Sequence, residues 1–292
     1  MFRSQILPEI ETLDPERDCC RIVYLNSCYD FPFDNAGALE FALFRTYAVP
    51  SISNLLDRTG EFGCRAQKRY DDTDLILSEI ICHGYDSQRG KAALRRMNQI
   101  HGRFEISNPD YLYVLSTFIY EPIRWNSKFG WRPFVEKEKQ AMFWFWREVG
   151  KRMGISDIPE DYHTFELFNR SYEDQHFELR PSNQRVGEAT CRLFLSWGPD
   201  WARPLGRRVI HALMDDPLRR AFGMPRAPFW VENAASIGLR LRARMLPFLP
   251  RRNEPVLRTR LPRAVYPNGY EIEALGPPPV GCRGPIFEEQ SG

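Results

Sequence analysis

The chain has 292 residues, of which 43% are hydrophobic and 13% aromatic, so it can bury a sizeable core and lacks the composition of a disordered protein. Its formal net charge of +2 says little by itself, and no recognised nucleic-acid-binding module accompanies its basic residues, so we expect no nucleic-acid partner. No apolar run reaches the roughly 18 residues that a membrane-spanning helix needs. The seven cysteines show neither C-x-x-C nor zinc-type spacing, which indicates a reducing, intracellular compartment.

Residues 1–18 hold five acidic side chains and Pro8, so we expect neither a signal peptide nor a membrane anchor there. From residue 36 onward the apolar residues recur at helical spacing and strand signals are sparse, which predicts an all-α protein. Ser87 is a candidate N-cap, and Pro50 and Pro122 are expected to end helices. The predicted helices cover residues 36–47, 51–56, 65–81, 89–101, 110–119, 136–153, 160–175, 182–195, 203–214 and 234–249.

A single large helical domain is therefore expected over residues 14–276. The chain becomes rich in proline and glycine from about residue 250, and residues 277–292 are expected to form a disordered tail.

The run Arg69-Tyr70-Asp71-Asp72-Thr73 lies on the predicted helix 65–81. Arg69, Asp72 and Thr73 occur at i, i+3 and i+4 and so share one helix face. Such a face is ordinarily a solvated surface with an ion pair. If it looks into a cavity instead, its guanidinium, carboxylate and hydroxyl could orient dioxygen, a substrate carbonyl or a migrating proton.

His101 follows Met97 and Leu94 on the apolar stripe of the predicted helix 89–101. A lone histidine in such a stripe is most often a satisfied core residue. A neutral imidazole on a rigid helix is also what a proximal haem ligand requires, and Asn98 could then orient its ring from one turn away. The chain has no H-E-x-x-H, G-x-S-x-G or P-loop motif.

Two further segments allow both a structural and a functional interpretation. The aromatic runs 125–131 and 143–146 could be core or could line a pocket for an apolar ligand, and we expect the second run to be core. Residues 238–263 hold eight arginines and one glutamate, a net charge of +7. This segment could cover the domain as a solvated helix, or it could contact an anionic membrane peripherally.

Several blocks of this sequence, in order, resemble the fungal MpaB-type ER-bound oxygenases and, more distantly, the bacterial rubber oxygenases. The resemblance runs from about Asp14 to Gly276. The blocks are LEFALFRTYAVPSISNLLDRTGEF (39–62), KRYDDTDLILSE (68–79), RRMNQIHGRFEISNPDYLYVLSTFIYEPIRW (95–125), GWRPFVEKE (130–138), VGKRMGISDIP (149–159) and YPNGYEIEALG (266–276).

The resemblance implies an all-α catalytic domain that holds haem b through one axial histidine, and His101 occupies the matching position. The rubber oxygenases carry an Arg-x-x-Lys-Thr motif near the haem. Arg69 and Thr73 match it, whereas Asp72 stands where the lysine is expected. The details of that mechanism therefore do not transfer intact. The fungal relatives also have an N-terminal membrane anchor, which residues 1–18 do not resemble.

Together these features predict a haem-dependent oxygenase that uses dioxygen to oxidise or cleave a carbon–carbon double bond of a small hydrophobic substrate, a terpenoid or prenylated metabolite. His101 would bind the iron with Asn98 as its neighbour, and Arg69, Asp72 and Thr73 would form the catalytic group. The protein is expected in the cytoplasm or on the surface of the ER membrane. The alternatives are a haem-free helical protein that binds a lipid or catalyses a non-redox rearrangement, and an adaptor on a membrane surface.

Overall fold

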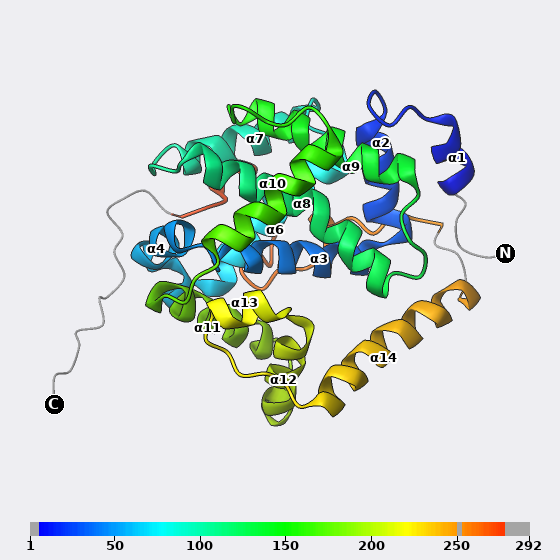
Figure 1. The fold of residues 1–292 in the computed structure, drawn as a ribbon. Coiled ribbons are helices and arrows are strands. Elements are labelled where there is room, and N and C mark those ends of the chain that lie inside the picture. The colour runs from blue at the N-terminus through cyan, green and yellow to red at the C-terminus, as the bar shows by residue number, and fades with distance from the viewer. Residues whose placement is uncertain (1–5, 250–252, 278–292) are drawn as a thin grey trace, which may run out of the picture.

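Helices form all of the regular structure in the computed structural model, which describes residues 6–249 and 253–277 (Figure 1). The predicted all-α fold is thus confirmed. The α-helices are α1 (Ile6–Thr12), α2 (Cys19–Leu25), α3 (Pro32–Thr46), α4 (Pro50–Thr59), α5 (Glu61–Cys64), α6 (Ala66–His83), α7 (Gln88–His101), α8 (Asn108–Phe129), α9 (Glu136–Arg152), α10 (Tyr162–His176), α11 (Pro181–Ser196), α12 (Arg203–Leu213), α13 (Asp216–Ala221) and α14 (Phe229–Met245). Single π and 3-10 turns are η1 (Asn26–Asp30), η2 (Asp200–Ala202), η3 (Leu246–Phe248), η4 (Arg258–Arg260) and η5 (Ile272–Ala274).

Helix α8 lies at the centre of the molecule and packs against α3, α9 and α10 (Figure 1). The main hydrophobic core joins α2 and α6–α10, and Phe143, Phe145 and Trp146 are almost completely buried in it. The expectation that the 143–146 run is core is therefore confirmed. A second apolar cluster joins the end of α3 to α11 and α13, and Leu43 packs against both clusters. This continuity agrees with a single domain.

A tight turn holds α6 and α7 side by side and thereby fixes the two helices that carry the predicted site residues. Gly84 ends α6 with a φ of 76°, which favours glycine. The hydroxyl of Ser87 accepts a hydrogen bond from the Gly90 amide at 2.9 Å, which confirms the predicted N-cap. A Cβ atom at Gly90 would overlap the Gly84 carbonyl oxygen, so the close approach of the two helices requires glycine there.

The prediction that Pro122 ends a helix is wrong, because α8 continues through it to Phe129. Proline removes one helical hydrogen bond, but packing holds both flanks of α8 in place. Phe118 stacks on Trp146 before the proline, and Trp125 contacts Phe41 after it. The 125–131 run therefore packs between helices as well. Sequence periodicity also missed the short helices α1, α2, α5 and α13, and α14 begins five residues before its predicted start.

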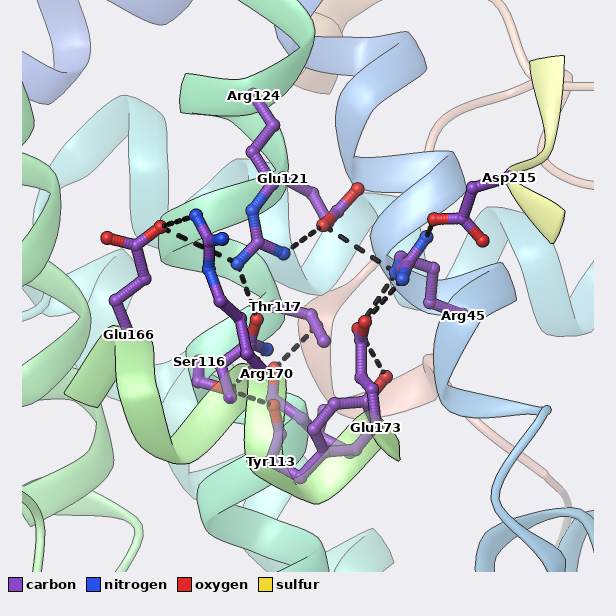
Figure 2. A network of polar contacts seen from close by, with 12 residues as sticks. Arg45, Tyr113, Ser116, Thr117, Glu121, Arg124, Glu166, Arg170, Glu173 and Asp215 are labelled. Atoms are coloured by element: carbon purple, nitrogen blue, oxygen red, sulfur yellow. Dashed lines mark hydrogen bonds and ion pairs between the residues drawn. The ribbon is translucent and has the colours of Figure 1, made fainter. Parts of the chain in front are cut away.

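A buried ion-pair network fastens α10 and the start of α13 to α3 and α8 (Figure 2). Arg45 of α3 forms a bidentate pair with Glu173 of α10, and its third nitrogen contacts Asp215 at 2.5 Å. Glu121 of α8 lies 3.6 Å away, and the Tyr113 hydroxyl donates to Glu173 at 3.0 Å. One guanidinium thus neutralises carboxylates from three separate segments, which links the second apolar cluster to the central helix.

Residues 256–277, named here the C-terminal strap, cross α6 and α7 and are attached by polar contacts. Arg258 donates to Asp74 at 2.9 Å, and the Tyr270 hydroxyl donates to Glu79 at 2.5 Å. Arg96 of α7 donates to the Leu275 carbonyl at 2.6 Å. The predicted disordered tail, apart from Pro277, lies outside the described residues.

Candidate active site

Arg69 carries a cationic group that faces a small cavity beside α6. Its guanidinium donates to the Thr73 hydroxyl one turn later, and it lies 5.9 Å from the centroid of the Phe62 ring. No carboxylate in residues 6–249 or 253–277 forms an ion pair with it. Thr73 in turn donates to the Arg69 carbonyl at 2.9 Å, which holds the pair together on one face of α6. The charge of Arg69 therefore remains available to a bound group.

The cavity lies between α3, α6 and α11, and η4 closes one end of it. Its volume is about 60 Å³, room for a few water molecules rather than for a porphyrin or a terpenoid. A ligand of either size would require the surrounding helices to separate. Much of the wall is apolar, and its apolar side chains include Leu39, Leu43, Leu77, Ile81, Leu193 and Phe194.

His101, at the end of α7, has a ring nitrogen that is buried without a partner. Among the described residues, nothing forms a hydrogen bond with its Nδ1 atom, which solvent does not reach. Burial, and to a smaller extent the positive charge of Arg69, together lower the pKa of His101 to about 4. The imidazole is therefore neutral at physiological pH and lies within electrostatic reach of Arg69. Its ring also packs edge-on against the ring of Tyr111, with 5.8 Å between the two ring centroids.

Arg69 and Thr73 contact each other and line the cavity. His101 does not line the cavity, and the charge of Arg69 is what connects it to this pair. Asp72 and Asn98 contact other partners. Asp72 is buried, does not line the cavity, and accepts hydrogen bonds from Lys68 at 2.7 Å and from the Tyr266 hydroxyl of the strap. Asn98 donates to the carbonyl oxygen of Arg152 at 3.0 Å, and no hydrogen bond links it to the Nδ1 of His101. The expected contact between Asn98 and that nitrogen is absent.

Glu40 and Tyr70 form a polar end of the cavity that sequence reasoning missed. The Tyr70 hydroxyl donates to Glu40 at 2.5 Å, and Arg258 donates to Tyr70 at 3.3 Å. Burial raises the pKa of Glu40, and the hydrogen bond from Tyr70 only partly offsets this effect. A carboxyl group whose pKa is raised in a cavity is a stronger proton acceptor than an ordinary carboxylate. The sequence does contain one indication of this site, because Glu40 is the only charged residue in the apolar run 36–44.

Cys28 and Cys82 also line the cavity, with their sulfur atoms 3.9 Å apart. All six cysteines in the described part of the chain are free thiols.

Comparison with known proteins gives two related findings. A family model described as "ER-bound oxygenase mpaB/B'/Rubber oxygenase, catalytic domain" matches residues 48–246. The ER-bound oxygenase mpaB of Penicillium roqueforti (strain FM164) is 30% identical over 210 residues, which cover 66% of this chain and 70% of that protein. The ER-bound oxygenase mpaB' of Penicillium brevicompactum is 30% identical over 210 residues, which cover 66% of this chain. The match spans 50% of that relative's length.

Proposed function

Because this chain belongs to the ER-bound oxygenase mpaB and rubber oxygenase catalytic-domain family, we propose that it is a haem-dependent oxygenase. In this proposal it uses dioxygen to oxidise or cleave a carbon–carbon double bond of a terpenoid or prenylated substrate. The observation that carries the proposal is the buried, neutral and partnerless Nδ1 of His101, which lies within electrostatic reach of Arg69. An imidazole nitrogen without a hydrogen bond is free to bind a metal ion.

The side chains present fit haem b as a ligand set. Haem iron needs only one nitrogen ligand from the protein, which His101 would provide. The described residues contain no cluster of three metal-ligating side chains, but haem does not require one. Haem bound there would supply the redox chemistry with dioxygen, and the protein would supply orientation and polarity. Asn98 would act indirectly, by fixing the end of α7 to the Arg152 carbonyl.

Arg69 and Thr73 would stabilise negative charge that develops on oxygen during the reaction. The guanidinium has no carboxylate partner among the described residues, and Thr73 fixes its position, so it needs little reorganisation to meet a developing charge. The leucine-rich wall supports a small hydrophobic substrate, because an apolar ligand needs an apolar lining with few polar groups. The helices around the cavity would have to separate as such a substrate enters.

Two carboxylates are candidates for the proton-transfer step. Asp72 is the candidate from the sequence motif, but its two oxygens accept hydrogen bonds from Lys68 and Tyr266. Glu40 lines the cavity and shares a hydrogen bond with Tyr70, whose hydroxyl could carry the proton onward. We favour Glu40 and retain Asp72 as the alternative.

An absorption spectrum with haem and iron quantitation tests the function. We expect the purified protein, after supply of haem, to show a Soret band with about one haem per chain. A colourless protein that binds a prenylated lipid without haem would contradict the proposal and support the haem-free alternative. Oxygen uptake and product analysis with a prenylated test substrate then address the reaction itself.

Replacing Glu40 with glutamine is expected to lower turnover by about 100-fold, because a proton acceptor is lost while the shape is kept. The same variant should not be less stable at neutral pH. Burial raises the pKa of Glu40 above its usual value of about 4.5, so the folded state holds this proton more tightly than the unfolded state does. This contribution to stability is present below about pH 4.5 and is lost as the pH rises through the folded pKa. Since glutamine does not ionise, the stability of the variant relative to wild type should increase over that range.

Urea unfolding between pH 4 and 8, together with single-turnover rates, measures both effects. Asp72→Asn is the matched comparison, and we expect it to lower stability by removing the ion pair with Lys68. If Asp72→Asn loses turnover at unchanged stability while Glu40→Gln reacts normally, the assignment is reversed.

A further inference from the structure

Helix α14 carries a stripe of large apolar side chains that faces away from the rest of the protein. Its members are separated by seven, four, four and three residues, so they share one face of the helix and of the η3 turn that follows it. Each has more than half of its surface exposed, up to 86% for Phe248. This apolar stripe consists of Trp230, Ile237, Leu241, Met245 and Phe248.

The opposite face of α14 attaches the helix to the domain, so the exposure of the stripe follows from how the helix is seated. Val231 and Ala243 are buried, and α14 packs against α12 and α8. Arg242 forms an ion pair with Asp34 at 2.9 Å and stacks over Phe33 at 3.9 Å. Figure 1 shows α14 along the edge of the molecule, on the side away from α7.

A basic pocket, formed by Lys128, Arg240 and Arg244 with Ser127 and Trp131, opens between the end of α8 and α14. Its volume is about 560 Å³, and its lining within residues 6–249 and 253–277 includes no carboxylate. In the described part of the chain, none of the three cations forms an ion pair. The pocket therefore presents three uncompensated charges beside the apolar stripe.

The +7 segment from residue 238 to 263 does not act as one basic face. Arg242 is paired with Asp34, and Arg258 and Arg263 are paired with Asp74 under the strap. Arg240, Arg244 and Arg260 form no ion pair with a described residue. Arg240 and Arg244 line the basic pocket, and Lys128 joins them from α8. Residues 251 and 252 lie outside the described residues.

We propose that this face of α14 docks on a membrane, with the phosphate of an anionic phospholipid in the basic pocket and the apolar stripe in the headgroup layer. Amphipathic helices bind bilayers in this way, by burying apolar side chains while basic residues attract anionic lipid. The apolar side chains of Ile237, Leu241 and Met245 would contribute little to binding a nucleic acid, because such binding relies on phosphate contacts and on stacking of bases against aromatic rings. The proposal does not depend on the reaction assigned above, and haem content and membrane binding are measured separately.

Sedimentation with vesicles tests the docking surface on the full chain. We expect binding to vesicles that contain 30% phosphatidylserine at low salt, and weak binding to pure phosphatidylcholine. The variant Lys128→Gln/Arg240→Gln/Arg244→Gln should bind on the order of 100-fold more weakly, since each basic residue near the surface contributes about fivefold. Leu241→Ser/Phe248→Ser should also weaken binding, because the stripe would lose two inserted side chains.

The matched control is Arg58→Gln/Lys91→Gln/Arg95→Gln, which removes the same charge from exposed residues on α4 and α7. It should bind the anionic vesicles nearly as wild type does, and circular dichroism should show that all variants are folded. Equal loss in the control and the pocket variant would overturn the proposal, as would wild-type binding by the stripe variant. Binding to RNA or to inorganic phosphate at matched ionic strength, without binding to vesicles, would overturn it as well.

Discussion

Replacing His101 with alanine is expected to remove most of the bound haem and with it the turnover. The imidazole is neutral, and among the described residues its buried Nδ1 has no hydrogen-bond partner, so this nitrogen is free to bind iron. The measurements are the Soret absorbance and the iron content per chain after gel filtration. Added imidazole should restore part of the Soret band in His101→Gly, because a free ligand can enter the space left by the ring.

His211 provides a strict control for this prediction. It is also buried, its Nε2 also lacks a partner in the described residues, and its pKa is also lowered by burial. It lies on α12, however, and the cations that lower its pKa are Arg207 and Arg219 rather than Arg69. His211→Ala should keep its haem, as should His83→Ala, whose ring lies 3.5 Å from Glu79. Full haem retention in His101→Ala, or haem loss in His211→Ala alone, would show that His101 is not the residue that binds the iron.

Replacing Arg45 with methionine is expected to lower the free energy of unfolding by about 3–5 kcal/mol, because removal of one partner leaves buried carboxylates without a counter-charge. Glu173 would lose a bidentate partner, and Glu121 and Asp215 would lose a nearby cation (Figure 2). Urea unfolding measures the change. The double variant Arg45→Met/Glu173→Met should recover part of the loss, since it removes both charges together.

Arg21→Met is the matched control for Arg45→Met. Arg21 pairs with Glu9 at 2.7 Å, but both side chains are largely exposed, and such pairs contribute less than about 1 kcal/mol. Similar losses in the two single variants would show that burial of the Arg45 network does not determine its contribution.

Local sequence signals were sufficient for most helices. The apolar spacing of α6 and the Ser87 cap of α7 gave their positions within a few residues, because both depend on residues close in the chain. Pro122 misled the prediction, since the packing of α8 against α3 and α9 compensates for the missing hydrogen bond. Helices α1 and α2 are only seven residues each, too short for periodicity to stand out.

The candidate site shows the same division between local and distant information. The i, i+4 spacing correctly placed Arg69 and Thr73 together, because both lie on one helix. The partner of Asp72 could not be inferred, since Tyr266 reaches it from 194 residues further along the chain. Glu40 was missed for a similar reason, because its burial and its bond to Tyr70 depend on how α3 packs beside α6.

The C-terminal strap has a consequence for the biosynthesis of the protein. Asp74 leaves the ribosome 184 residues before Arg258, and Lys68 leaves it 208 residues before the Gly276 carbonyl that it contacts. At translation rates of 5–20 residues per second, this interval lasts about 10–40 s. During that time the strap does not yet cover α6, although the charged side chains of α6, Arg69 among them, have already been synthesised. The cavity is therefore completed only when the first residues of the strap emerge, and nascent chains that stall before residue 256 would lack its η4 wall.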